Sequence, residues 1–296
     1  MKLSYEGLKD KEAWRKAGAA LPEYDWKAMC EATKKAPVWV HFGAGNIFRG
    51  FIAGLQQRLL NQGLAKSGIV AAETFDYDII DKIYWPHDSM TLMVSLRPDG
   101  STEKEVIASI AQGVKADSSD KEQWETLKKI FENPALQMAS FTITEKGYAI
   151  RDIQGNLMKV VSEDMEQGPG KARHAMSVVA ALMFARFQAG AAPVALVSMD
   201  NCSHNGEKLK GSVLAIVKAW KDNGLVPAEF EAYMSDEERV SFPWSMIDKI
   251  TPRPAEVIEK QLTDAGVEDM APVITSRNTY IAPFVNAEIP QYLVVD

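Results

Sequence analysis

The sequence alternates short apolar runs with longer stretches of helical periodicity, and this alternation restricts the possible folds more than any other feature. The run Val38-Trp39-Val40-His41-Phe42 is typical of a buried strand, and it stops at a glycine. Apolar residues recur at helical spacing over 47–60, and 67–75 is a second apolar run. Because parallel strands need crossover helices, the pattern predicts an α/β, doubly wound fold with a mostly parallel sheet.

The same alternation continues along the rest of the chain. Ser119, with Glu122 three positions later, predicts a capping box at the start of a helix, and the polar turn 152–155 predicts a hairpin. Further strands are predicted at 90–96, 137–144 and 194–199, and further helices at 171–189, 206–222 and 254–265. We expect one Rossmann-type domain over 1–296, with an N-terminal extension (1–36), a core (37–225) and a helical tail (226–296).

The bulk composition excludes several classes of partner. A formal charge of −7 without any run of Lys or Arg offers no surface to nucleic acid or to an anionic membrane. Cys30 and Cys202 form neither a disulfide framework nor a CxxC motif, and the N-terminus lacks the apolar core of a signal peptide. The four histidines are scattered without zinc-binding spacing. We therefore expect a cytoplasmic protein without a metal.

A glycine-containing turn, GAGNIFRG from Gly43, lies between the first strand and the first helix. Gly43 allows a tight turn, and Gly45 lets backbone approach a pyrophosphate beside the helix N-terminus. Phe48 occupies the position where a third glycine is usual, and it should hold helix and strand further apart. Arg49 either adds charge to the phosphate or is an exposed helix arginine. The predicted cofactor-binding residues of this turn are Gly43, Gly45, Asn46, Ile47 and Arg49.

An acidic residue is expected where the second strand ends, because a carboxylate there binds the adenosine ribose hydroxyls. Glu73 and Asp76 both qualify, and Glu73 is preferred because it ends the apolar run. The alternative is that either is a solvated loop carboxylate. An acid at this position favours NAD over NADP, since it repels a 2′-phosphate. Similar glycine turns also occur in methyltransferases and for purely structural reasons.

Four segments together are similar to the polyol-specific long-chain dehydrogenases, the mannitol dehydrogenase family, which includes fructuronate reductase. They are HFGAGNIFRGFIA from His41, TITEKGY from Thr142, SMDNCSHNG from Ser198 and FPWSMIDKITP from Phe242. The resemblance implies a Rossmann-type cofactor domain and a mainly helical second domain that supplies a catalytic lysine. It also implies hydride transfer between nicotinamide and a secondary alcohol of a small polyol or sugar acid.

The resemblance assigns catalytic roles to three residues. Asn201 matches an asparagine that holds the developing alkoxide, which is the task of an oxyanion-hole amide. Glu145 matches a carboxylate that helps proton exchange, and Asp248 lies in a segment close to nicotinamide and substrate. The structural alternatives are that Asn201 caps a helix, that Glu145 pairs with Lys146, and that Asp248 pairs with Lys249 or Arg253.

The family's KxxxxNxxH pattern of the second domain is missing, since neither Lys249 nor Lys260 has Asn and His at those spacings. We expect a fragment that ends near the entry to the second domain, and that binds dinucleotide without turning over substrate by itself. The alternatives are a non-catalytic dinucleotide-binding protein and a methyltransferase. The substrate stays open among mannitol, fructuronate, tagaturonate and a sugar phosphate, with a uronate or a free polyol preferred.

Overall fold

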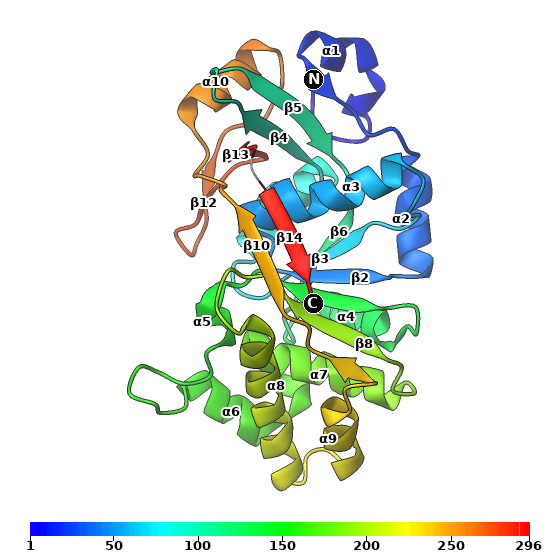
Figure 1. Ribbon diagram of the computed structural model, residues 1–296, viewed down its shortest axis with the longest axis vertical. Helices are drawn as coiled ribbons and strands as arrows, with labels where there is room; N and C mark the ends of the chain where they lie inside the picture. The colour runs from blue at the N-terminus through cyan, green and yellow to red at the C-terminus, as the bar shows by residue number, and fades with distance from the viewer. Residues whose placement is uncertain (290) are drawn as a thin grey trace. The chain divides into compact units, whose positions relative to one another are not determined.

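The computed structural model describes residues 1–289 and 291–296, and the chain forms two compact units, each containing strands and helices (Figure 1). Unit 1 comprises Met1–Pro37, Ala44–Gly113 and Asp248–Tyr292, and unit 2 comprises Val38–Gly43, Val114–Ile247 and Leu293–Asp296. Unit 1 thus combines the predicted N-terminal extension with parts of the predicted core and tail. The chain passes from unit 2 to unit 1 between Gly43 and Ala44, inside the glycine turn.

Unit 2 is built on a parallel sheet. Its strands are hydrogen-bonded in the order β2 (Trp39–Phe42), β7 (Met138–Phe141), β8 (Val194–Ser198) and β9 (Val240–Ser241). The first three confirm the predicted buried strands. Backbone N–H groups of Thr142 and Met199 donate to Phe42 O (2.9 Å) and Phe141 O (2.7 Å), just past the strand ends. The carboxyl ends of β2, β7 and β8 therefore meet at one edge, which is where α/β folds bind ligands.

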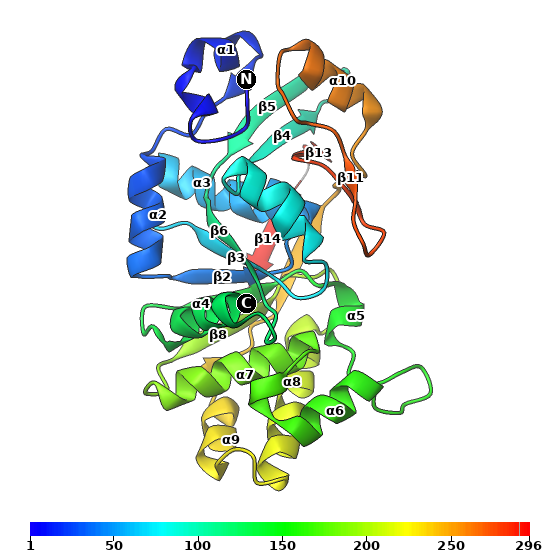
Figure 2. The ribbon, with the colours of Figure 1, turned by 180° about the vertical axis from the view of Figure 1, so that it is seen from behind.

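The helices of unit 2 pack around the almost wholly apolar α7 (Ala175–Gln188), which contacts both α4 and α8 (Figure 2). The other helices are α4 (Lys121–Glu132), α5 (Thr144–Tyr148), α6 (Lys159–Gln167), η5 (Pro169–Lys171), α8 (Asn205–Asp222) and α9 (Ala228–Ser235). The predicted capping box is wrong: Asp120 caps α4 by accepting from Gln123 N, while the Ser119 hydroxyl donates to Asp117 (2.7 Å). The hairpin predicted at 152–155 is confirmed by an antiparallel bridge between Arg151 and Leu157.

Unit 1 contains the predicted helix and second strand that follow the glycine turn. The helix begins as a π-helix, η2 (Phe48–Ile52), and continues as α3 (Ala53–Asn61). Strand β3 (Ile69–Glu73) is buried along its whole length and neighbours β6 (Ile110–Lys115). After β3 the chain forms the short helices η3 (Ile80–Tyr84) and η4 (Trp85–His87).

A second sheet in unit 1 was not predicted from the sequence. Its order is β1 (Ala19–Ala20), β5 (Thr102–Ile107), β4 (Thr91–Leu96) and β13 (Phe284–Glu288). Strand β4 confirms the run predicted at 90–96, but it pairs antiparallel with β5 through a turn in which Gly100 has φ +83°. The outer pairs are parallel. A β-hairpin therefore interrupts the strand–helix alternation.

The two ends of unit 1 share one apolar core. Trp14 and Leu3 pack with Ile258 and Leu262, and the N-terminal ammonium group of Met1 donates to Gly266 O (2.6 Å). The N-terminal helices are η1 (Gly7–Lys9), α1 (Lys11–Lys16) and α2 (Trp26–Lys35). The tail contains the expected helix α10 (Glu256–Asp264), together with unpredicted strands β10 (Ser245–Lys249), β11 (Val273–Ile274), β12 (Tyr280–Ile281) and β14 (Gln291–Val295).

Candidate functional site

Gly43 is required by the fold itself. Its φ is +106°, a conformation that side chains strongly disfavour. A Cβ built at this position would lie 2.2 Å from the backbone oxygen of Thr142, at the end of the adjacent strand β7. Glycine therefore lets the chain leave β2 beside β7, as the tight turn predicted from the sequence demands.

Gly45 differs from Gly43 because nothing in the protein requires it to be glycine. A Cβ at this position would have no atom within 4 Å, and its φ is not in the left-handed region. In the described part of the chain, the backbone N–H groups of Gly45, Asn46 and Ile47 have no hydrogen-bond acceptor. Open space beside unpaired N–H groups at the start of a helix fits the binding of a phosphate.

Arg49 is buried, with a side chain that the protein already uses. Its Nη1 donates to Ala282 O (2.9 Å) and its Nη2 donates to the side-chain oxygen of Asn46 (2.7 Å). Burial lowers the pKa of Arg49 to about 10. The alternative of an exposed helix arginine is therefore wrong, because the Arg49 side chain is 1% exposed. A direct phosphate contact by Arg49 stays a prediction.

The Glu73 carboxylate holds the turn from inside unit 1. One oxygen accepts from Ala44 N (2.8 Å), while the other accepts from the backbone N–H groups that follow, including Phe75 N (2.9 Å) and Asp76 N (3.2 Å). Burial raises the pKa of Glu73, and these N–H groups partly oppose that shift. The alternative of a solvated loop carboxylate is wrong for Glu73, because the residue is buried and both of its carboxylate oxygens accept backbone hydrogen bonds.

Asp76 is also buried, but one of its oxygens has no partner. Oδ2 accepts from the Thr275 hydroxyl (2.6 Å), whereas Oδ1 is buried without a hydrogen bond within the described residues. The solvated alternative is therefore wrong here too. Because an unpaired buried carboxylate oxygen is costly, this orphan acceptor marks Asp76 as the better candidate for a ribose hydroxyl than Glu73.

In unit 2, Asp200 joins the loops that follow β7 and β8. Its carboxylate accepts from Tyr148 OH (2.6 Å), Ile143 N (2.9 Å) and Thr144 N (3.0 Å), and Ser198 Oγ donates to Tyr148 OH (2.8 Å). Burial raises the pKa of Asp200, opposed by the Tyr148 hydrogen bond. The sequence analysis did not single out Asp200 or Tyr148, although they lie in the segments SMDNCSHNG and TITEKGY.

Asn201 directly follows Asp200 in the chain. It is exposed, and its side chain makes no hydrogen bond within the described residues. The alternative that it caps a helix is wrong, because the N-cap position of α8 is His204. Asn205, not Asn201, is the structural amide: it donates to Asp200 O (3.1 Å) and to Ser245 O (2.9 Å). The side chain of Asn201 is therefore available to a ligand.

The other two predicted catalytic residues are exposed carboxylates. Glu145 pairs with Lys208 of α8, so the alternative of a pair with Lys146 is wrong. Asp248 forms no ion pair in the described part of the chain, which excludes the proposed pairs with Lys249 and Arg253. Lys249 instead donates to the backbone oxygen of Glu288. The buried Lys249 therefore connects the end of β10 to the end of β13 through this hydrogen bond.

His41 is a fully buried polar residue of β2. Its Nδ1 and Nε2 lie 2.6 and 2.8 Å from the hydroxyls of Ser140 and Thr142, and burial lowers its pKa to about 3. The unfolded chain takes up a proton near pH 6.5, so stability must fall as the pH drops below that value. Between pH 7 and pH 5 this group costs about 2 kcal/mol.

We expect His41→Asn to remove that dependence. In urea unfolding at pH 7 and pH 5, the free-energy loss on acidification should be about 2 kcal/mol smaller than in the wild type. Gln154→Asn, at an exposed position that does not titrate, serves as the control and should leave the pH dependence unchanged. An equal loss in His41→Asn and wild type would contradict the assignment.

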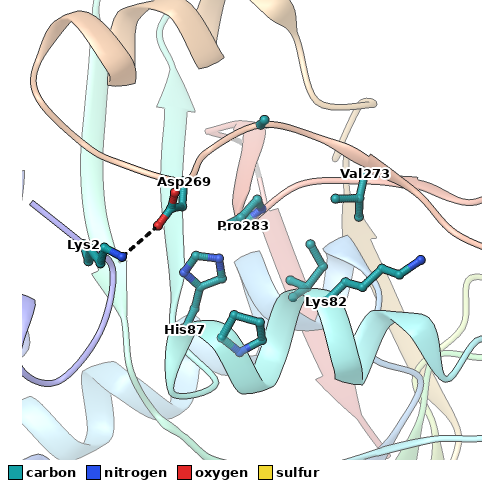
Figure 3. Close-up of a pocket in the computed structure, with 9 residues that line it drawn as sticks. Lys2, Lys82, His87, Asp269, Val273 and Pro283 are labelled. Atoms are coloured by element: carbon teal, nitrogen blue, oxygen red, sulfur yellow. Dashed lines mark ion pairs between the residues drawn. The ribbon is translucent and has the colours of Figure 1, made fainter.

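A hollow of about 330 Å³ in unit 1 involves none of these residues (Figure 3). Its charged groups are already paired: Lys2 with Asp269 (3.4 Å) and Lys82 with Asp78 (2.8 Å). Nothing in its lining therefore identifies a ligand.

Among the described residues, no cluster of three or more His, Cys, Asp or Glu is arranged to hold a metal ion. Within 1–289 and 291–296, no helix has the length and apolarity to cross a membrane.

A parallel sheet whose first strand ends in a glycine turn that opens a helix N-terminus defines a Rossmann-type α/β protein. Comparison with known proteins identifies the family. Residues 37–279 match the family model of the mannitol dehydrogenase Rossmann domain. The chain belongs to the mannitol dehydrogenase family, which confirms the resemblance carried by its four motifs.

Two relatives and one solved structure extend this match. The chain is 50% identical to a D-mannonate oxidoreductase of Thermotoga maritima over 296 residues, which is 100% of this chain and 54% of that protein. It is 28% identical to a polyol:NADP oxidoreductase of Gluconobacter oxydans, over 87% of this chain and 50% of that protein. The fold matches a mannitol 2-dehydrogenase of Pseudomonas fluorescens, solved with NAD and D-mannitol, at a TM-score of 0.77 and 23% identity (100% of this chain, 54% of the other). The chain therefore spans about half the length of the curated relatives it matches.

Proposed function

We propose that this chain binds NAD at the glycine turn, as the cofactor-binding part of an oxidoreductase. The open space at Gly45 carries the proposal, because neither φ nor a neighbouring atom explains the missing side chain. The N–H groups of Asn46 and Ile47 would hold the pyrophosphate. Asp76 would accept from a ribose hydroxyl, and Glu73 would keep the turn in place. When bound, the nicotinamide supplies the hydride acceptor or donor.

The substitution Gly45→Ala tests the turn without disturbing the protein. The added methyl group has room in the folded chain, so the midpoint of thermal unfolding should stay unchanged. It would occupy the space for the pyrophosphate, and the Kd for NADH should rise at least about tenfold, or about 1.4 kcal/mol. Gly211→Ala, in an equally open position on α8, is the matched control. Equal NADH affinity in both variants would contradict the proposal.

For the whole protein we propose NAD-dependent interconversion of an aldonate or polyol with its keto form. The D-mannonate oxidoreductase relative supports an aldonate, and the other relatives support polyols more broadly. In this proposal the Asn201 amide donates to the oxygen that gains charge, Glu145 exchanges protons with solvent, and Asp248 lies toward the substrate. Asp200 is a positioning residue, because its carboxylate accepts from Ile143 N and its carbonyl accepts from the Asn205 amide, which holds the residue that precedes Asn201.

A substrate panel tests this activity. The protein expressed from its natural gene should form NADH from NAD with D-mannonate, more slowly with D-mannitol, and not with a sugar phosphate. The preference for D-mannonate follows from the 50% identity with the Thermotoga maritima relative. NADH formation with a polyol alone would contradict the aldonate preference, and no NADH formation with any member of the panel would contradict the proposed activity.

A further inference from the structure

The loop after β3 exposes an aromatic ring next to the two buried acids. Phe75 is 62% exposed, although it stands between the buried carboxylates Glu73 and Asp76 in the chain. The guanidinium of Arg277 lies over this ring, with its carbon 4.8 Å from the ring centroid. In Rossmann-type proteins this loop faces the adenosine part of the cofactor. An exposed ring at this place offers a surface on which a base can stack.

Arg277 is held there by the β11–β12 hairpin. Thr275 at its tip donates to Asp76 (2.6 Å), and Ser276 N donates to Asp78 (2.8 Å). The Thr275 hydroxyl also accepts from Arg277 N (3.2 Å) and Thr279 N (3.0 Å). These hydrogen bonds fix the hairpin tip against the loop after β3. They hold the backbone of Arg277 beside the loop, and from this position its guanidinium lies over Phe75.

The charges on this loop favour a phosphate. Both oxygens of Glu73 accept backbone N–H groups, and Asp76 is buried against Thr275. Asp78 is paired with Lys82 (2.8 Å). Arg277 is the exposed cation beside the ring, and it makes no ion pair in the described part of the chain. A 2′-phosphate on the adenosine ribose would meet the exposed guanidinium of Arg277, while the carboxylates of Glu73 and Asp76 are buried.

From these contacts we infer that Phe75 and Arg277 form an adenosine clamp: Phe75 stacks on the adenine, and Arg277 pairs with the 2′-phosphate of NADP. The chain then binds both NADP and NAD, where an acid alone would restrict it to NAD. This inference rests on the proposed dinucleotide site and names the residues that decide its cofactor choice. Asp76 accepts from the ribose 2′-hydroxyl of NAD, which the 2′-phosphate replaces in NADP.

Binding measurements on the 296-residue chain test the clamp independently of activity. Kd values for NADH and NADPH are measured by calorimetry for the wild type and for Phe75→Ala, Arg277→Gln and Arg253→Gln. Phe75→Ala should weaken both cofactors about tenfold, since it removes the stacking surface. Arg277→Gln should weaken NADPH at least about tenfold and NADH less than about threefold. Arg253→Gln, an exposed arginine of the same unit, should change neither.

The outcomes separate the clamp from the site on which it rests. If the wild type binds neither cofactor, the dinucleotide site and the clamp both fall. If the wild type binds NADH but Phe75→Ala binds both cofactors with unchanged affinity, or Arg277→Gln weakens both equally, the clamp alone is overturned. Titration with AMP and with 2′,5′-ADP provides a second readout. Tighter binding of 2′,5′-ADP that is lost in Arg277→Gln supports the clamp, and equal binding of both overturns it.

Discussion

Asn201→Ala is expected to lower kcat for the natural substrate by about 10² to 10³-fold, the usual cost of removing one oxyanion-hole donor. The exposed amide has no partner within the described residues, so its removal leaves no buried group unsatisfied. The affinity for NADH should therefore stay within about twofold of the wild type. The measurement is steady-state kinetics of the protein expressed from its natural gene, with NADH titration alongside.

A matched control separates a catalytic role from a general effect of losing an amide. Asn156→Ala changes an exposed asparagine in the 152–156 turn of unit 2 and should leave kcat unchanged. Thermal unfolding of both variants should match that of the wild type. An unchanged kcat in Asn201→Ala would remove Asn201 from the reaction, and a loss of stability that parallels the loss of activity would make its role structural.

Gly43→Val is expected to cost about 3 kcal/mol of unfolding free energy and to abolish NADH binding. The side chain would be forced into a φ of +106° with its Cβ only 2.2 Å from a backbone oxygen, so the strand end itself must move. Urea unfolding and NADH calorimetry measure the two effects. The turn would then no longer present its N–H groups to a phosphate.

Gly190→Ala separates the backbone strain from the clash. Gly190 has φ +117°, but a Cβ added there would have no atom within 4 Å, so only the strain applies. We expect a loss of about 1 kcal/mol there, with NADH affinity unchanged. If Gly43→Val were as stable as Gly190→Ala, the close approach of Thr142 O would not be what requires glycine at the turn.

The strand–helix alternation was readable because strands such as β3 and β8 are buried on both faces and are therefore continuously apolar. The second sheet of unit 1 was not readable, because β4 and β5 form a hairpin and β13 comes from a distant part of the chain. Sequence periodicity reports local burial and carries no information on such distant pairing. The Asp-Gly turn at Asp99-Gly100 was the available local signal for the hairpin.

The sequence motifs identified which residues form the candidate site, but they did not predict what each residue does there. Gly43 and Gly45 look alike in the sequence, and only the contacts of an added Cβ show that one serves the fold and the other an open space. Glu73 was preferred over Asp76 because it ends an apolar run, yet that position makes its carboxylate a cap for the turn. For Arg49 a phosphate contact and an exposed helix arginine were both open, and the sequence did not show that the side chain is buried and bonded to Ala282 O and Asn46.

Calorimetric titration of the 296-residue chain with NADH, repeated in the presence of excess S-adenosylmethionine, tests the central claim most directly. We predict one saturable NADH site per chain, with an affinity that S-adenosylmethionine leaves unchanged. The absence of saturable NADH binding, or its displacement by S-adenosylmethionine, would contradict a dinucleotide site at the glycine turn.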